Sequence, residues 1–296
     1  MISFAFSGGR VKSLSSNTRS ALLVCRWASM QATDAAKARN ADVEAAALVV
    51  GASRGIGLAI SQVLPKRFKG KIFCACRNPD EAGALGALWQ FNPERFTILK
   101  MDVTEEASVS EAAEKLKEIS GGRLDLLINT AGILHDKSTS RMPERNLSQV
   151  DADWMIENFK INTVGPALVM KHFTPLMITS RKEGRVFSLL ATISARVGSI
   201  SDNQLGGWYS YRISKAAQNQ LSRTSSLELK RRGTAIVALH PGTVNTDLSE
   251  PFQGNVRPEK LFPVDTAAVQ LLDVIDSLDI SDSGKFFDYA REPIEW

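Results

Sequence analysis

Short apolar runs alternate with amphipathic stretches from about Ala45 to the C-terminus. Runs such as Leu124–Ile128 are almost continuously apolar, which is typical of a strand that is covered on both faces. We predict strands at Ala46–Val50, Ile72–Cys76, Phe96–Met101, Leu124–Ile128, Arg185–Leu190, Ala235–Leu239 and Lys285–Phe287. We predict helices between them at Gly55–Phe68, Glu105–Ile119, Asp151–Met177, Tyr211–Arg232 and Val264–Leu278. This alternation predicts a single Rossmann-type, doubly wound α/β domain with a seven-stranded, mostly parallel sheet.

The first part of the chain differs from the rest in its charge. Residues 1–33 contain four basic side chains, no acidic one and many serines, whereas the remainder carries equal numbers of basic and acidic residues. That composition is typical of an organelle transit peptide. We therefore predict a transit peptide or disordered leader over residues 1–44 and the enzyme domain over residues 45–296.

The destination of the leader is predicted from its charge distribution. The first nine residues are uncharged, which favours a chloroplast, whereas Arg19–Met30 could form the basic amphipathic helix of a mitochondrial leader. We favour the chloroplast over the mitochondrion. A cytoplasmic location is expected if the leader is only a disordered tail.

Composition narrows the range of partners. A neutral body offers no net positive field to nucleic acid or to an anionic membrane, and no apolar run approaches the roughly 20 residues of a membrane span. The three cysteines and three histidines show no disulfide framework or metal-ligand spacing. We expect a small-molecule substrate, no metal, no nucleic acid and no membrane, and we leave open a homo-oligomer.

A glycine-rich turn directly follows the first predicted strand and opens a helix. It reads Gly51, Ala52, Ser53, Arg54, Gly55, Ile56 and Gly57. Glycine lets the backbone turn tightly and approach a diphosphate, whose charge a helix N-terminus stabilises. The strand–turn–helix context predicts dinucleotide binding.

A second signal is the pair Tyr211 and Lys215 at the start of a predicted helix. A spacing of four places both side chains on one face. A lysine cation beside a phenol favours the phenolate and lowers the tyrosine pKa from its usual value of about 10. The pair is therefore a candidate for proton transfer near neutral pH.

With these motifs the chain resembles the short-chain dehydrogenase/reductase family from about Ala45 to the C-terminus. The glycine turn matches the family fingerprint, although Val50 stands where a threonine is usual. Further matches are Asp102-Val103, Asn129-Thr130-Ala131-Gly132 and Pro241-Gly242-Thr243-Val244-Asn245-Thr246. Through Ser194–Ile200 and Gly206–Arg212 the chain is most similar to carbonyl reductases of the C-factor and sniffer type.

The resemblance implies a role for each matching residue. Tyr211 would protonate the substrate carbonyl, Lys215 would assist it and bind the nicotinamide ribose, and the backbone of Asn162 would hold a relay water. At the position where the family has its catalytic serine, this chain has Ala195, so we select the neighbouring Ser194 as the polarising hydroxyl. The implied cofactor-binding residues are Gly51, Ser53, Arg54, Gly55, Ile56, Gly57, Arg77, Asp102, Val103, Asn129, Ala131, Gly132, Lys215, Pro241, Gly242, Val244 and Thr246.

The predicted cofactor is NADPH/NADP+. An NAD enzyme usually places an acidic residue after the second strand, where this chain has Arg77, and Arg54 lies inside the glycine turn. Two guanidinium groups there would bind a 2′-phosphate through charge-assisted hydrogen bonds.

We therefore expect an NADPH-dependent reductase of aldehydes or ketones. The loops Leu134–Gln149 and Thr246–Pro263 are candidates to shape its substrate pocket. One alternative is a 3-oxoacyl-carrier-protein reductase. A non-catalytic NADPH-binding sensor or scaffold is the alternative of another class, because Ala195 departs from the family pattern.

Overall fold

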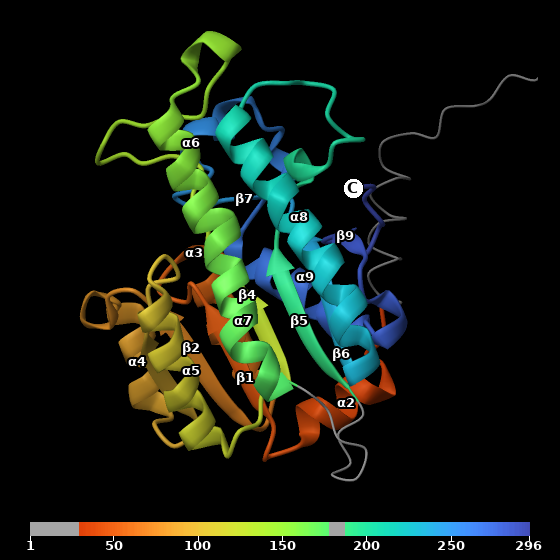
Figure 1. The fold of residues 1–296 in the computed structure, drawn as a ribbon. Coiled ribbons are helices and arrows are strands. Elements are labelled where there is room, and N and C mark those ends of the chain that lie inside the picture. The colour runs from red at the N-terminus through yellow and green to blue at the C-terminus, as the bar shows by residue number, and fades with distance from the viewer. Residues whose placement is uncertain (1–29, 178–186) are drawn as a thin grey trace, which may run out of the picture. The chain divides into compact units, whose positions relative to one another are not determined.

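The computed structural model describes residues 30–177 and 187–296, apart from the side chain of Asn255. Ala32–Trp296 form one compact unit (Figure 1). The predicted leader lies largely outside the described residues, as does the start of the strand predicted at Arg185–Leu190.

A seven-stranded sheet forms the centre of this unit, and all its strand pairs are parallel. The order is β3-β2-β1-β4-β5-β6-β9. The strands are β1 (Ala46–Val50), β2 (Lys71–Cys76), β3 (Phe96–Lys100), β4 (Leu126–Asn129), β5 (Ser188–Ile193), β6 (Thr234–His240) and β9 (Phe286–Asp288). The predicted Rossmann-type fold is confirmed, with strand ends displaced by up to three residues.

Helices cover both faces of the sheet (Figure 1). On one face lie α5 (Glu106–Ser120), α6 (Ala152–Phe159), α7 (Gly165–Met177) and α8 (Tyr209–Leu229); on the other lie α3 (Gly55–Val63), α4 (Gly83–Phe91) and α9 (Val264–Ser277). A π-helical turn at Lys160–Val164 joins α6 to α7, so the long helix predicted there is interrupted at Asn162. No described helix is long and apolar enough to cross a membrane.

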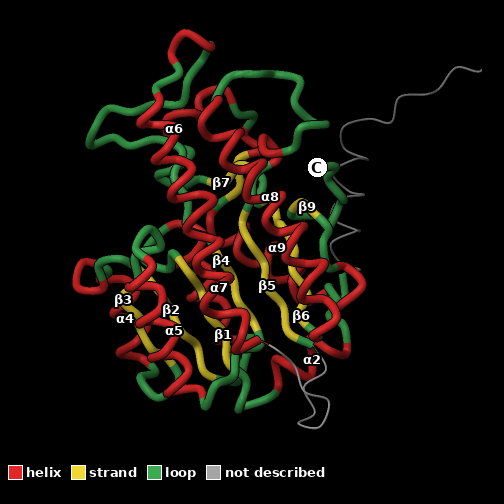
Figure 2. Tube along the Cα trace, in the orientation of Figure 1, coloured by secondary structure: helices red, strands yellow, loops and turns green. Residues whose placement is uncertain are grey.

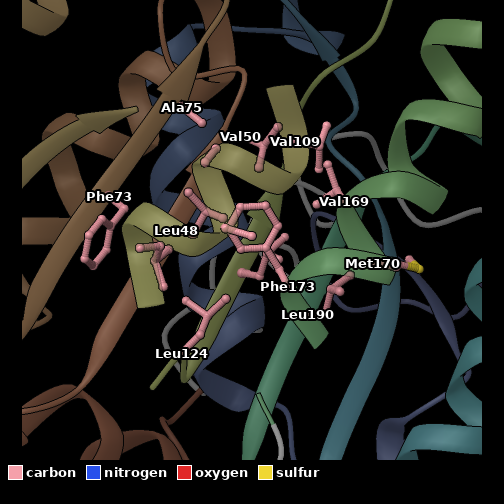
Figure 3. Packing of buried hydrophobic residues seen from close by; sticks show 14 of the residues in the cluster. Leu48, Val50, Phe73, Ala75, Val109, Leu124, Val169, Met170, Phe173 and Leu190 are labelled. Carbon is pink, nitrogen blue, oxygen red and sulfur yellow. The ribbon is translucent and has the colours of Figure 1, made fainter. Parts of the chain in front are cut away.

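The core between the sheet and the helices on the α5 and α7 side is apolar and closely packed. Figure 3 shows Phe173 of α7 among Leu48, Val169 and Leu190. Phe173, Leu48 and Leu190 are fully buried. Burying such side chains contributes roughly 1.5–3 kcal/mol each. This packing holds α7, and with it the π turn at its start, firmly against the sheet.

A short parallel pair lies beyond the main sheet. It joins β7 (Thr243–Val244) to β8 (Leu261–Phe262). This pair closes the ends of the predicted loop Thr246–Pro263 near the carboxyl end of β6. Open α/β sheets bind ligands at the carboxyl ends of their strands, beside the point where the strand order reverses.

One predicted boundary is wrong. Residues Asp34–Ala41 form α2, which packs against α9 as part of the domain. Thr33 caps α2 by accepting a hydrogen bond from Ala36 N at 3.1 Å, and the Arg39 guanidinium contacts Asp276 Oδ1 at 2.8 Å. The folded domain therefore begins near Ala32 and not at Ala45, because tertiary contacts stabilise a helix that the leader-like composition concealed.

Candidate active site

The glycine turn lies between β1 and α3 and allows a close approach of two backbones. A Cβ atom on Gly57 would lie 2.3 Å from Gly51 O, a distance that no side chain tolerates, and Gly51 has φ of +80°. Arg54 precedes α3 without a side-chain cap. The N–H groups of the first helical turn have no acceptor within the helix. The turn therefore has the geometry and the free donors that a diphosphate requires.

The loop after β6 comes beside the glycine turn. A Cβ on Gly55 would lie 3.6 Å from Thr246 Cγ2, and a cavity of about 220 Å³ lies between α3 and this loop. Gly242 has φ of +77° and leaves no room for a side chain beside Phe262. Val244 is buried. Asn245 and Thr246 thus line one cavity with Gly55 of the glycine turn.

Two arginines are predicted to bind the 2′-phosphate of the cofactor: Arg77 directly follows β2, and Arg54 lies in the glycine turn. Arg77 is exposed, and its side chain forms no hydrogen bond or ion pair with any described residue. Arg54 Nη1 lies 3.8 Å from Asp247 Oδ2, and both side chains are largely exposed. Both guanidinium groups are therefore available to an anionic ligand, because a pair this exposed is worth at most about 1 kcal/mol.

Asp102 and Val103 follow β3 at the same edge of the sheet. Asp102 Oδ1 accepts hydrogen bonds from the Thr104 backbone N at 2.9 Å and from Thr104 Oγ1 at 2.8 Å. Val103 is buried, and a Cβ on Gly165 would lie 2.9 Å from its Cγ2 atom. These bonds hold Asp102 in a fixed orientation at the edge where the adenine is expected.

The segment after β4 connects the glycine turn to the catalytic candidates. Asn129 Oδ1 accepts a hydrogen bond from Ala131 N at 3.1 Å, which shapes the turn. A Cβ on Gly132 would lie 3.1 Å from Asn162 Oδ1 and 3.4 Å from Lys215 Nζ. Gly132 therefore allows this segment to pass directly beside both side chains.

The structure brings together three of the four predicted catalytic residues. Tyr211 and Lys215 are both buried, and Lys215 Nζ lies 5.8 Å from the centre of the Tyr211 ring. Asn162 is fully buried in the π turn, and its side chain bonds the backbone N and O of Ile133, both at 2.8 Å, and Ser214 Oγ at 3.0 Å. Asn162 lies within the π turn Lys160–Val164, and π turns inside helices are frequent at functional sites.

Burial controls the protonation of this pair. It raises the pKa of Tyr211 and lowers the pKa of Lys215 to about 7, because a water-poor site disfavours the charged form of each group. The prediction that the lysine lowers the tyrosine pKa is therefore not what this structure shows. The phenol retains its proton at neutral pH, and the lysine exchanges its proton near pH 7.

Ser194 is used inside the protein. Its hydroxyl donates a hydrogen bond to Asn219 Oδ1 at 2.6 Å, and Asn219 Nδ2 in turn donates to Gly198 O at 3.2 Å. Ser194 and Asn219 are both buried. A polarising role for Ser194 would require this bond to break, since a hydroxyl has a single proton to donate.

Sequence reasoning missed an aromatic cluster beside Tyr211. The Trp208 ring lies 6.3 Å from that of Tyr211 and 4.8 Å from that of Phe252, which lies 6.1 Å from the His135 ring. Trp208 adopts φ of +54°, an uncommon conformation for a tryptophan. Phe252 and His135 come from the two predicted pocket loops, which gather near the start of α8 (Figure 2).

Two polar contacts tie these loops to each other and to α8. Lys137 Nζ lies 2.8 Å from Glu250 Oε2, joining one loop to the other. The buried Glu144 carboxylate accepts hydrogen bonds from the Ser210 backbone N at 3.2 Å and from Ser210 Oγ. A carboxylate at a helix N-terminus is stabilising. Within the described residues, no cluster of His, Cys, Asp and Glu could hold a metal ion.

Known proteins that are similar to this chain identify its family. The sequence profile of the family described as short chain dehydrogenase matches residues 45–256. A 1-hydroxy-2-glutathionyl-2-methyl-3-butene dehydrogenase of Rhodococcus sp. (strain AD45) is 33% identical over 252 residues, covering 84% of this chain and 98% of that protein. The C-signal protein of Myxococcus xanthus is 35% identical over 175 residues, covering 59% of this chain and 94% of that protein.

The fold is also similar to solved structures of carbonyl reductases. An NADPH-bound carbonyl reductase from chicken fatty liver has 32% identity and a TM-score of 0.75, covering 85% of this chain and 98% of that chain. The carbonyl reductase Sniffer of D. melanogaster has 26% identity and a TM-score of 0.76, covering 86% of this chain and 100% of that chain. The chain belongs to the short-chain dehydrogenase/reductase family. Within that family it is an oxidoreductase whose structural neighbours include carbonyl reductases.

Proposed function

We propose that this protein is an NADPH-dependent carbonyl reductase that converts an aldehyde or ketone into an alcohol. The observation that carries the proposal is the buried pair of Tyr211 and Lys215, packed beside Gly132 and Asn162 at the sheet edge that also carries the glycine turn. A proton donor beside a dinucleotide site is the arrangement that carbonyl reduction needs.

When bound, NADPH would provide the hydride that carbonyl reduction requires. Tyr211 donates its phenolic proton to the carbonyl oxygen, so that a C–H and an O–H bond form together across the former double bond. Burial keeps the phenol protonated before the reaction. Lys215 would bond the nicotinamide ribose and, with a pKa of about 7, would help to restore the tyrosine proton. The backbone of Asn162 would hold a water molecule for that proton path.

The cofactor would be held by residues at the carboxyl edge of the sheet. The first turn of α3 would bind the diphosphate, while Arg54 and Arg77 would bind the 2′-phosphate. Asp102 would lie near the adenine, and Pro241–Thr246 with Gly132 would hold the nicotinamide end. Structural neighbours are described with NADPH or NADP bound, which supports the choice of the phosphorylated cofactor.

The test of the mechanism is Tyr211→Phe, with Tyr209→Phe as a control in the same helix. Loss of the proton donor should lower kcat by about 10²–10⁴-fold. The dissociation constant for NADPH should change less than twofold, because the phenol makes no contact with the diphosphate site. Tyr209→Phe should retain normal turnover. The mechanism is wrong if the Tyr211→Phe enzyme reduces carbonyls at a rate near that of the unmodified protein.

The cofactor proposal is tested by comparing NADPH with NADH in the unmodified protein and in Arg77→Asp. A carboxylate at this position should repel the 2′-phosphate, so KM should rise at least tenfold for NADPH and change little for NADH. Arg231→Asp, which makes the same charge change after the far end of α8, should leave both values unchanged. Equal use of both cofactors by the unmodified protein would contradict the proposal.

A non-catalytic NADPH-binding protein is the second candidate. It is favoured by one observation. Ala195 stands at the position of the family serine, and the neighbouring Ser194 hydroxyl is bonded to Asn219. A panel of aldehydes, ketones, quinones and 3-oxoacyl thioesters, assayed with NADPH, separates the two. Tight NADPH binding without oxidation by any member of the panel would favour the second candidate. Turnover of the thioesters alone would identify a 3-oxoacyl reductase.

A further inference from the structure

A buried glutamine side chain lies between the catalytic lysine and the sheet. Gln218 of α8 is fully buried, and its Oε1 atom accepts a hydrogen bond from Lys215 Nζ at 2.9 Å. Its Nε2 atom donates to Thr192 Oγ1 of β5 at 2.8 Å. The amide therefore joins Lys215 to a central strand of the sheet.

The donors and acceptors determine the orientation of this amide. The lysine ammonium has only donors, so Gln218 must present its oxygen to protonated Lys215 and its NH₂ group to Thr192. Lys215 Nζ makes a second bond to Ile193 O at 3.1 Å. Two of the three ammonium N–H groups are thus occupied by acceptors on α8 and β5. The third N–H remains for the side of the site that holds Tyr211 and Gly132.

The partners of Lys215 are all uncharged. β5 provides a backbone carbonyl, α8 provides the Gln218 amide, and the π turn and the segment after β4 bring Asn162 and Gly132 close. The titratable neighbour is Tyr211, which burial keeps neutral. No carboxylate of the described residues contacts Lys215, so burial of the ammonium is not offset by an ion pair.

We propose that Gln218 is a positioning residue that holds the Lys215 ammonium in place through a neutral hydrogen bond anchored on Thr192, leaving one N–H for the cofactor ribose. This inference rests on the proposed function of Lys215. A neutral acceptor holds the lysine without adding charge, so the lysine can lose and regain its proton near neutral pH. A carboxylate in the same place would hold the charge permanently.

The experiment compares Gln218→Glu, which keeps the shape and adds a charge, with Gln218→Leu, which removes both bonds. The pKa of Lys215 is read by NMR titration of the full-length protein labelled with ¹³Cε-lysine, and the signal is assigned by its loss in Lys215→Met. Gln218→Glu should raise the pKa of Lys215 by more than one unit. The basic limb of the pH profile of kcat/KM should move in the same direction.

Gln218→Leu should lower kcat/KM at least tenfold at pH 7 and raise KM for NADPH, because the ammonium loses its orientation. Thr192→Val, which removes only the anchor of the amide, should give a smaller loss in the same direction. Ser222→Ala changes the same buried face one turn away and serves as the control, since the Ser222 hydroxyl donates its hydrogen bond to the Gln218 backbone O and not to the side-chain amide. This control should retain the pH profile.

Folding of each variant is checked by circular dichroism and thermal unfolding. If Gln218→Leu does not fold, Gln218→Glu and Thr192→Val carry the test. The proposal is overturned if folded Gln218→Glu shows the lysine pKa and the pH profile of the unmodified protein. The NMR titration needs no turnover, so failure of the proposed function through Tyr211→Phe is distinguished from failure of this inference.

Discussion

The ion pair between α2 and α9 predicts a measurable contribution of residues 32–41 to stability. Arg39 Nη2 lies 2.8 Å from Asp276 Oδ1, and the Arg39 side chain is only 3% exposed. Replacing Arg39 by Met would leave the Asp276 carboxylate with Asn40 at 2.9 Å and Arg67 at 3.6 Å. Removing one partner of a buried pair costs about 3–5 kcal/mol. Because Arg67 remains nearby, we expect a loss of about 3 kcal/mol, which corresponds to about 6–12 °C in Tm.

Urea and thermal unfolding of the full-length chain test this expectation. Lys37→Met removes a cation from the same helix, but its pair with Asp34 is exposed and should contribute less than about 1 kcal/mol. The double variant Arg39→Met with Asp276→Leu should recover part of the loss, since it leaves no unpaired charge. A Tm of Arg39→Met within 2 °C of the unmodified protein would refute the reasoning and restore the domain boundary at Ala45.

The remaining predictions concern pH and targeting. Burial, with a contribution from Arg196, lowers the pKa of His240 from 6.5 to about 3. Between these two pH values His240 is protonated in the unfolded chain and neutral in the folded protein. The stability from neutral His240 is therefore complete above pH 6.5 and should fall by about 3–5 kcal/mol as the pH drops to 3. Urea unfolding at pH 4.5 and 7 should show this slope, and His240→Asn should reduce it. A fluorescent protein fused behind residues 1–31 should enter the chloroplast, and cytosolic fluorescence would contradict the targeting prediction.

The sheet was predictable because each strand is a short, nearly continuous apolar run. Two helices were not. α2 is polar, with only Ala36 and Arg39 buried, and its stabilising contact with Asp276 spans 237 residues of sequence. α4 contains two glycines and buries only Leu85, so it lacks a clear apolar face. In both cases tertiary packing, and not local pattern, determines the helix.

The site was predictable where a motif specifies backbone geometry. Gly51 and Gly57 meet at the turn as expected because only glycine permits that approach. The protonation of Tyr211 was not predictable, since the spacing to Lys215 says nothing of how deeply both are buried. The partners of Ser194 were equally hidden, because a hydroxyl beside a strand end can face either the substrate or the next helix.

The buried face of α8 explains why a reactive lysine can be held without a counter-charge. That face carries Ser210, Ser214, Gln218, Asn219, Ser222 and Ser226 among its buried residues, in a position where a helix against a sheet is usually apolar. A buried polar group without a partner costs about 1–3 kcal/mol, so each must find a hydrogen bond. Those bonds join α8 to β5, to the π turn and to the loop at Glu144. Apolar packing would let α8 slide by small steps, whereas directional bonds fix its register, and with it the distance between Tyr211 and Lys215.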